Sequence, residues 1–371
     1  MLVWWLIGVV LFLAYVNGAN DNFKGVATLF GSRTTDYRKA LWWATATTLA
    51  GSLATCLLSG GLVKTFSGNG LVAEAFTHEP VFLLSVGLGA ALTVMVATMT
   101  GLPISTTHAL TGALVGAGLV SAGSVNLGRF GQSVFVPLAI SPFLSFACTG
   151  LLYPVLRQIR ARLGIERQMC LCVDGGLIQP VQVQPDGTAV LQATGVRLTV
   201  GQLKHCVERY HGRIIGFDAQ WVLDRVHFVS AGLVSFARGL NDTPKIVALL
   251  VAASGLGANL SIGLLAIGVA MAIGGLLNAH RVAITMSERI TSMNHGQGFT
   301  ANLVTSLLVI TASRFGLPVS TTHVSCGSLF GLGAVTRTAR WSTAWTIILA
   351  WLITVPLAAC LAAGLAWLSR I

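Results

Sequence analysis

The chain has 371 residues, of which 54% are hydrophobic and only 9% are charged, and its formal net charge is +11. A soluble protein of this length needs far more charged side chains to cover its surface, so the composition excludes an ordinary soluble protein and indicates an all-helical integral membrane protein. We expect the basic excess to face anionic lipid and not a nucleic acid.

Apolar runs near the roughly 20 residues that span a bilayer recur through the first part of the chain. The first run has no basic region before it and no clear cleavage site, so we expect a retained helix and not a signal peptide. The segments predicted to cross the membrane in this part are 2–31, interrupted near 17–22, then 40–60, 80–99, 103–121 and 132–156.

The interval 157–225 is polar, and we expect it to be a linker or a small cap because it is too short for an enzyme domain. Pro185-Asp186-Gly187 predicts the turn of a hairpin, and the part around 201–215 is amphipathic. Cysteines and histidines in this interval could form a metal site, but their Cys-x-Cys spacing is not that of a standard zinc knuckle, so we predict no metal. The residues concerned are Cys170, Cys172, His205, Cys206 and His211.

A second set of apolar segments follows the polar interval. With five crossings before that interval and five after it, most basic residues fall on its side of the membrane, which predicts a cytoplasmic interval and both termini outside, in a plasma (bacterial inner) membrane. An odd number of crossings per half predicts two repeats of inverted topology. The predicted segments are 226–252, interrupted near 238–244, then 259–279, 299–313, 318–335 and 342–369, and the predicted domains are 1–156, 157–225 and 226–371.

A short polar element occurs once in each half, as GAND at 18–21 and as GLND at 239–242. Asp21 and Asp242 are the acidic residues that fall well within predicted membrane segments, where a charge normally marks an ion pathway or a buried pair. Gly18 and Gly239 are expected to weaken the helix, so that broken helices or hairpins line a polar cavity at the motifs. The alternative is that each aspartate merely caps a half-helix.

A longer element is also repeated, as GLPISTTH at 101–108 and GLPVSTTH at 316–323. Gly-Leu-Pro is expected to end one helix, and Ser-Thr-Thr to start the next. Hydroxyls and free N–H groups at a helix N-terminus favour an anion, although a single Ser-Thr-Thr is more often an ordinary N-cap. His108 and His323 either shuttle protons or are hydrogen-bonded helix residues. The anion candidates are Ser105, Thr106, Thr107, Ser320, Thr321 and Thr322.

These motifs in this order resemble the PiT-type inorganic phosphate transporter family. The resemblance also includes SFARGLND at 235–242, RVAITMSERIT at 281–291 and GFTANLV at 298–304, and it covers nearly all of the chain outside the polar interval. It implies an inverted-repeat fold and phosphate uptake coupled to sodium or protons, with the Ser-Thr-Thr residues contacting phosphate. The residues that it implies for the coupling cation are Asn20, Asp21, Asn241 and Asp242.

The chain departs from that family directly after each Asn-Asp. The usual continuation there is Val-Ala-Asn-Ala, whereas here Lys24 and Lys245 take the place of the asparagine in the two halves. One interpretation is that both amines snorkel to an interface or pair with the aspartates for structure. The sharper hypothesis is that an ammonium group lies where a relative would hold sodium, attracts the anion and makes transport depend weakly on sodium.

Two other functions are open at this stage. The sites would also accept sulfate or another tetrahedral oxyanion, carried by proton coupling or facilitated diffusion. An intramembrane enzyme using His108 or His323 with the aspartates is disfavoured, because the elements are duplicated in matching order and show no nucleophile–base motif. We therefore predict a carrier and no enzyme, no cofactor other than sodium or protons as coupling ions, and the lipid bilayer and phosphate as partners; a homo-oligomer stays open.

Overall fold

The computed structural model describes residues 2–58, 62–63, 66, 71–72, 74–126, 128, 131–168, 172–174, 197–199, 209–214, 216–252 and 260–370. The chain forms two compact units: one contains 1–158 and 223–371, and the other contains 159–222. Of the expectations for the polar interval, Cys170, His205, Cys206 and the turn at 185–187 lie outside the described residues.

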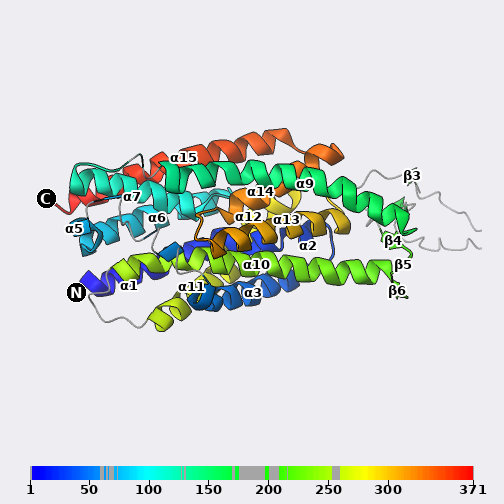
Figure 1. The fold of residues 1–371 in the computed structure, drawn as a ribbon, viewed down its shortest axis with the longest axis horizontal. Coiled ribbons are helices and arrows are strands. Elements are labelled where there is room, and N and C mark those ends of the chain that lie inside the picture. Colours follow the sequence, from blue (N-terminus) through cyan, green and yellow to red (C-terminus); the bar gives the residue numbers. More distant parts are fainter. Residues whose placement is uncertain are drawn as a thin grey trace, which may run out of the picture. The chain divides into compact units, whose positions relative to one another are not determined.

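The described residues in the first half of the larger unit are mainly helical (Figure 1). Their elements are α1 (Leu2–Asp21), the 3₁₀ turn η1 (Asn22–Gly25), α2 (Ala27–Gly31), α3 (Tyr37–Leu58), α5 (Glu74–Thr77), α6 (Pro80–Thr100), α7 (Thr106–Ala122), the π-helical turn η2 (Gly131–Phe135) and α9 (Val136–Arg162).

The second half has a similar order of long and short helices. They are α10 (Ala219–Ala252), α11 (Leu260–Asn278), α12 (His280–Ile284), the π-helical turn η4 (Thr285–Arg289), α13 (His295–Arg314), α14 (Thr321–Thr336) and α15 (Trp341–Leu368).

The smaller unit contains short antiparallel strand pairs among its described residues. β1 (Glu166–Gln168) pairs with β4 (Arg209–His211), β2 (Cys172–Asp174) with β3 (Arg197–Thr199), and β5 (Arg213–Ile214) with β6 (Phe217–Asp218).

By length and composition, four described helices could cross a membrane, namely Leu2–Gly25, Pro80–Thr100, Val136–Arg162 and Trp341–Leu368. A fifth is counted if Ile262–Asn278 and His280–Arg289, bent by 70°, form one span. The sequence pattern predicts twice as many. The difference arises partly because α7 and α14, with 17 and 16 residues, are shorter than the roughly 20 residues that a spanning helix needs.

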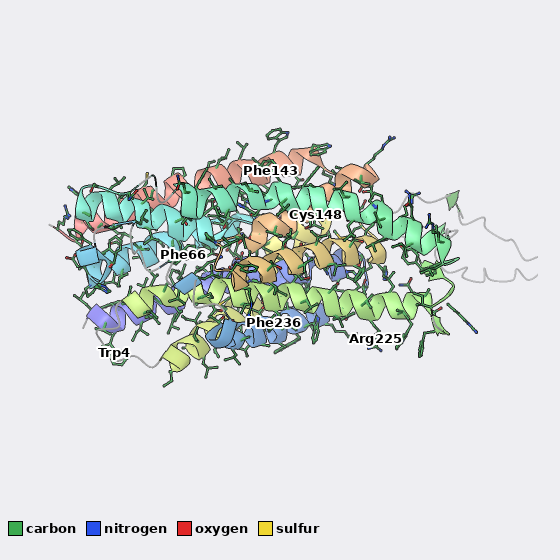
Figure 2. All side chains as sticks on the ribbon, viewed as in Figure 1. Trp4, Phe66, Phe143, Cys148, Arg225 and Phe236 are labelled. Atoms are coloured by element: carbon green, nitrogen blue, oxygen red, sulfur yellow. The ribbon has the colours of Figure 1, made fainter. Side chains whose placement is uncertain are left out.

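The exposed and buried side chains are distributed as a membrane protein requires. Large apolar side chains such as Trp4 and Phe143 are 77% and 75% exposed, and they project from the helices in Figure 2. Serine, threonine, asparagine and charged side chains are meanwhile buried between the helices. A protein surrounded by water would not expose so much apolar surface, whereas lipid covers it without cost.

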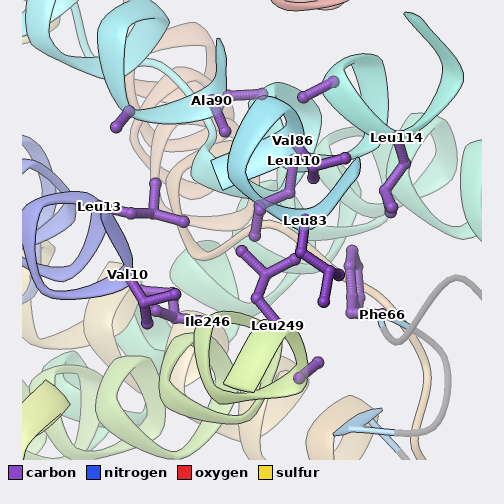
Figure 3. Packing of buried hydrophobic residues seen from close by; sticks show 14 of the residues in the cluster. Val10, Leu13, Phe66, Leu83, Val86, Ala90, Leu110, Leu114, Ile246 and Leu249 are labelled. Atoms are coloured by element: carbon purple, nitrogen blue, oxygen red, sulfur yellow. The ribbon is translucent and has the colours of Figure 1, made fainter. Parts of the chain in front are cut away.

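A large apolar cluster fills the space between α1, α6, α7 and α10. Figure 3 shows Val10 and Leu13 of α1 close to Ile246 of α10, with Leu83 of α6 beside Leu249. The cluster also holds apolar residues of α11 and α15, and Figure 1 shows α6, α7 and α15 side by side. Apolar packing therefore fixes the helices that carry the polar residues described below.

The predicted helix break near 238–244 is wrong: α10 runs without interruption from Ala219 to Ala252, with Pro244 inside it. Membrane helices tolerate proline because neighbouring groups satisfy the carbonyl that it frees. In the first half the helix does break, at Asn22–Gly25, which begins at the last residue of the predicted interval 17–22.

The two motif glycines permit close packing and do not weaken their helices. A Cβ atom added to Gly18 would lie 1.9 Å from the carbonyl oxygen of Met271 in α11, and one added to Gly239 would lie 2.1 Å from that of Thr48 in α3. Only glycine allows backbones to approach this closely, which is the common use of small residues in membrane helices.

Candidate functional site

Among the residues that the structure describes, five buried side chains carry a formal charge: Asp21, Lys24, Arg238, Asp242 and Lys245. Each is at most 4% exposed, and the ion pairs among them link Lys24 to Asp21, and both Arg238 and Lys245 to Asp242. Three cations and two carboxylates leave a formal charge of 3 − 2 = +1. Such a dry, positively charged cluster favours an anion next to it.

Lys24 lies in η1, where the first helix breaks, and its ammonium group is surrounded by oxygen atoms. It forms an ion pair with Asp21 and donates to Asn20 Oδ1 at 2.8 Å and to the carbonyl of Ile104 at 2.8 Å. It also donates to Thr322 Oγ1, in the other half of the chain, at 2.7 Å. One amine therefore joins the first Asn-Asp element to both Ser-Thr-Thr elements.

Lys245 repeats this arrangement with the halves exchanged. Its Nζ lies 3.6 Å from Asp242 Oδ1 and donates to the carbonyl of Val319 at 2.7 Å, one residue before the second Ser-Thr-Thr. It also donates to Thr107 Oγ1, in the first half, at 2.8 Å. The two lysines thus reach equivalent atoms, although one stands in a helix break and the other in an unbroken helix.

The two motif asparagines, Asn20 and Asn241, bind the C-terminal ends of α6 and α13 and the turns that follow these helices. Asn20 Nδ2 donates to Thr98 Oγ1 at 3.0 Å and to the carbonyl of Leu102 at 3.1 Å. Asn241 accepts from Ser313 Oγ at 3.2 Å and donates to the carbonyl of Val319 at 3.1 Å. Each asparagine therefore links the Asn-Asp element of its half to the turn that precedes Ser-Thr-Thr in the same half.

Arg238 and Asn17 belong to this cluster and were not among the predicted site residues. Arg238 Nη2 donates to Asn17 Oδ1 at 2.6 Å, and Nη1 donates to Asn22 Oδ1 at 3.1 Å. Asn17 Nδ2 in turn donates to Asp21 Oδ2 at 3.2 Å and to Asp242 Oδ2 at 3.4 Å. Their signal in the sequence is a polar residue four positions before each motif aspartate, on the same helix face.

The Ser-Thr-Thr elements start helices, as predicted. Ser105 Oγ accepts from the backbone N–H of His108, and Ser320 Oγ from that of His323, each at 3.2 Å, so both serines are N-caps. Gly101, with φ of 74°, ends α6 in the left-handed region that glycine favours. The threonines that follow are buried, and the two helix N-termini both face the charged cluster through the lysine contacts.

The two motif histidines are in contact with each other. Their ring centroids lie 4.3 Å apart, and the ring of Trp351 lies 3.9 Å from that of His323. Nδ1 of His108 has no hydrogen-bond partner in the described part of the chain. The two histidines therefore pack against each other in the first turns of α7 and α14.

The structure thus brings together both Asn-Asp elements, both lysines and both Ser-Thr-Thr elements, which lie far apart in the sequence. Among the described residues, we find no group of three or more histidine, cysteine, aspartate or glutamate side chains that could hold a metal ion. What the cluster offers is positive charge, hydroxyl groups and two helix N-termini, and this combination suits an oxyanion with several acceptor oxygens.

Comparisons with known proteins point to the same kind of ligand. Residues 17–362 match a family described as the Phosphate transporter family. The chain is 28% identical to the "Probable low-affinity inorganic phosphate transporter" of Rhizobium meliloti, over 96% of this chain and 93% of that one. It is 27% identical to "Inorganic phosphate transporter 2-1, chloroplastic" of Arabidopsis thaliana, over 96% of this chain and 70% of that one.

A solved structure shows the same fold. It is described as "The sodium-dependent phosphate transporter" and superposes with a TM-score of 0.77 over 100% of this chain and 99% of that chain. The sequence identity between the two is 22%, so this likeness supports the helical architecture.

Proposed function

We propose that this chain, which belongs to the phosphate transporter family, moves inorganic phosphate by alternating access at a site shared between two inverted halves. Its family consists of integral membrane transporters and not of enzymes, so the chain is a phosphate permease. The single observation that carries the shared site is the pair of crossed contacts, Lys24 to Thr322 and Lys245 to Thr107.

Reciprocal packing supports the inverted repeat. The first long helix of each half packs through its motif glycine on the second long helix of the other half, as Gly18 does on α11 and Gly239 on α3. The two Ser-Thr-Thr helices behave in the same way: α7 packs on α15 of the second half, and α14 packs on α9 of the first. A pseudo-twofold axis produces this exchange of partners, and in secondary transporters such an axis passes through the substrate site.

The proposed anion site lies between the N-termini of α7 and α14. Thr107 and Thr322 present hydroxyls there, each already bound to a lysine from the opposite half. An oxyanion would accept from the Thr107 hydroxyl, from the ammonium groups and from free N–H groups of the first helical turns. The Thr322 hydroxyl donates to the carbonyl of Ile104 at 2.8 Å and would turn from it to the anion. Ser105, Thr106, Ser320 and Thr321 complete the proposed set, the serines as N-caps that shape the two ends.

We extend the proposal to alternating access and to orientation in the membrane. The larger unit can rock about the shared site if one half moves against the other, which is the usual motion of inverted-repeat carriers. The excess of basic residues on the side of the central interval supports a cytoplasmic position for 157–225 and both termini outside. A plasma (bacterial inner) membrane is proposed on the same basis.

His108 and His323 are retained as a proposed proton relay. The contact between their rings supports it, and protons or sodium are the coupling ions that the family resemblance implies. Because the two rings are in contact, a positive charge on one disfavours a positive charge on the other, so a relay would involve both residues. Uptake that is accelerated by an inward proton gradient, and is no longer accelerated when both are replaced by asparagine, would support this role.

The proposed function is tested by reconstituting the purified protein in liposomes and measuring uptake of labelled phosphate. We expect uptake that unlabelled phosphate and arsenate inhibit and that sulfate inhibits weakly. If sulfate is taken up and phosphate is not, the alternative of a sulfate permease holds. If neither anion exchanges across the membrane under any condition, the proposed function is wrong.

Replacing Thr107 or Thr322 by valine is expected to weaken phosphate binding by about tenfold or more each. The change keeps the shape and removes one hydroxyl, and hydrogen bonds to a charged group contribute about 1.5–3 kcal/mol, where ~1.4 kcal/mol is tenfold in affinity. The half-saturating phosphate concentration for uptake measures the effect.

Thr100→Val is the matched control for this prediction. Thr100 is exposed at the end of α6, where its hydroxyl donates to the carbonyl of Val96 in its own helix at 3.1 Å. We expect this variant to transport phosphate as the parent does. Unchanged half-saturation in both Thr107→Val and Thr322→Val would contradict the shared site.

A further inference from the structure

We infer that Lys24 and Lys245 are covalently attached substitutes for coupling cations, so that this chain carries its anion without sodium. The inference rests on the proposed function and adds to it that sodium is not the driving ion. In secondary transporters that use sodium, the ion lies near the substrate and is held by carboxylate, carbonyl and hydroxyl oxygens at unwound or terminal helix segments. Here an ammonium group of the protein lies in such a place in each half.

The surroundings of Lys24 Nζ are those of a bound cation. Four oxygen atoms of different kinds contact it: the carboxylate of Asp21, the amide of Asn20, the carbonyl of Ile104 and the hydroxyl of Thr322. A hard monovalent cation prefers oxygen ligands of these types. The ammonium group therefore already occupies the oxygen ligands that a sodium ion would need.

Lys245 has the same kinds of partner on the other side of the pseudo-twofold axis. Its Nζ contacts the carbonyl of Val319 and the hydroxyl of Thr107, with the carboxylate of Asp242 at 3.6 Å. Its carbonyl partner comes from the turn before α14 and its hydroxyl partner from α7, so its contacts extend beyond its own aspartate to both Ser-Thr-Thr elements. Both lysines make these additional contacts, so the purely structural interpretation leaves their symmetry unexplained.

The charge of the cluster points in the same direction. With Arg238 included, the buried groups already carry a formal charge of +1 before any anion binds. Adding sodium would bring a further positive charge into a buried region, where the cost of uncompensated charge is high. An anion, by contrast, lowers the net charge. The charge of the cluster therefore favours binding of the anion without sodium. A sodium gradient then has no binding step through which to act.

The experiment uses the full-length protein in liposomes. Labelled phosphate uptake and phosphate–phosphate exchange are measured in sodium buffer, and again with sodium replaced by N-methyl-D-glucamine. We expect the same initial rates in both buffers and no accumulation driven by an inward sodium gradient. Reproducible stimulation of the parent protein by sodium would overturn the inference while leaving the phosphate permease intact. Absence of phosphate exchange in both buffers would instead contradict the proposed function.

A lysine-to-asparagine exchange tests the same idea from the other side. The double variant Lys24→Asn/Lys245→Asn opens both oxygen sites, and we expect sodium to stimulate its uptake by about fivefold or more, the lower end of ordinary coupling between two ligands. Lys39→Asn is the matched control, because Lys39 is exposed and pairs with Asp36 at the surface. A folded double variant that shows no response to sodium would overturn the inference.

A second measurement does not depend on transport. Sodium is expected to raise the melting temperature of the double variant and not that of the parent, because an ion that binds only the folded state stabilises it. Potassium and N-methyl-D-glucamine at equal concentration control for ionic strength. If the double variant does not fold, binding of radioactive sodium to the parent decides the question: no saturable binding is expected, and saturable binding would overturn the inference.

Discussion

Replacing Arg238 by methionine is expected to destabilise the protein by about 3–5 kcal/mol, the usual cost of removing one partner of a buried ion pair. Arg238 is 1% exposed, and its guanidinium contacts Asp242, Asn17 and Asn22. Methionine keeps much of the volume but leaves the amide oxygens of both asparagines without this donor. We expect a clear fall in melting temperature in detergent and loss of phosphate exchange.

The physical reason is that Arg238 orients the residue that touches both carboxylates. Its hydrogen bond to Asn17 Oδ1 turns the Nδ2 group of that amide towards Asp21 and Asp242. Without it the amide can rotate, and the two carboxylates lose a shared donor. Arg238→Lys should be intermediate, because lysine restores the charge but not the planar fork that reaches several oxygens at once.

A double-mutant cycle distinguishes this role from simple packing. Arg238→Met/Asp242→Asn removes one charge of each sign, so the formal charge of the cluster stays at +1. We expect the double variant to be less destabilised than the sum of its single variants, because both single variants lose the same Arg238–Asp242 ion pair. Additive effects, or a melting temperature of Arg238→Met equal to that of the parent, would contradict the role proposed for Arg238.

Sequence patterns predicted the features that depend on local chemistry. The starts of α7 and α14 at Ser105 and Ser320 follow from Gly-Leu-Pro and N-capping, which act within a few residues. The two lysines were visible because the halves can be aligned on their Asn-Asp elements. Membership of a phosphate transporter family was likewise evident from the order of the motifs and is confirmed.

Features that depend on contacts between distant segments could not be predicted. The helix was expected to break near Pro244, but α10 continues through that position. Gly18 and Gly239 were expected to weaken their helices, because a sequence does not show that Met271 and Thr48 will lie against them. The role of Arg238 has the same origin, since Asn17 is its partner only in the folded chain.

Replacing Gly116 by valine is the second change for which we expect a large effect, namely loss of most of the correctly folded protein. A Cβ atom at this position would lie 2.0 Å from the carbonyl oxygen of Ala359 in α15, so the backbones of α7 and α15 would have to separate. Overpacking typically costs about 1–3 kcal/mol, and more where the obstacle is backbone, as it is here.

Gly364→Val in α15 is the matched control for Gly116→Val, because no atom lies within 4 Å of a Cβ added to Gly364. Both variants add the same side chain to a membrane helix, so lower helix propensity or altered insertion would affect them alike. If α7 must lie directly against α15 for its N-terminus to reach Lys245, Gly116→Val should lose monodisperse protein and phosphate exchange, and Gly364→Val should not.

Gly331→Val changes the equivalent contact in the other half, between α14 and Phe146 of α9. We expect it to behave like Gly116→Val, and a difference between these two variants would contradict the reciprocal packing of the halves.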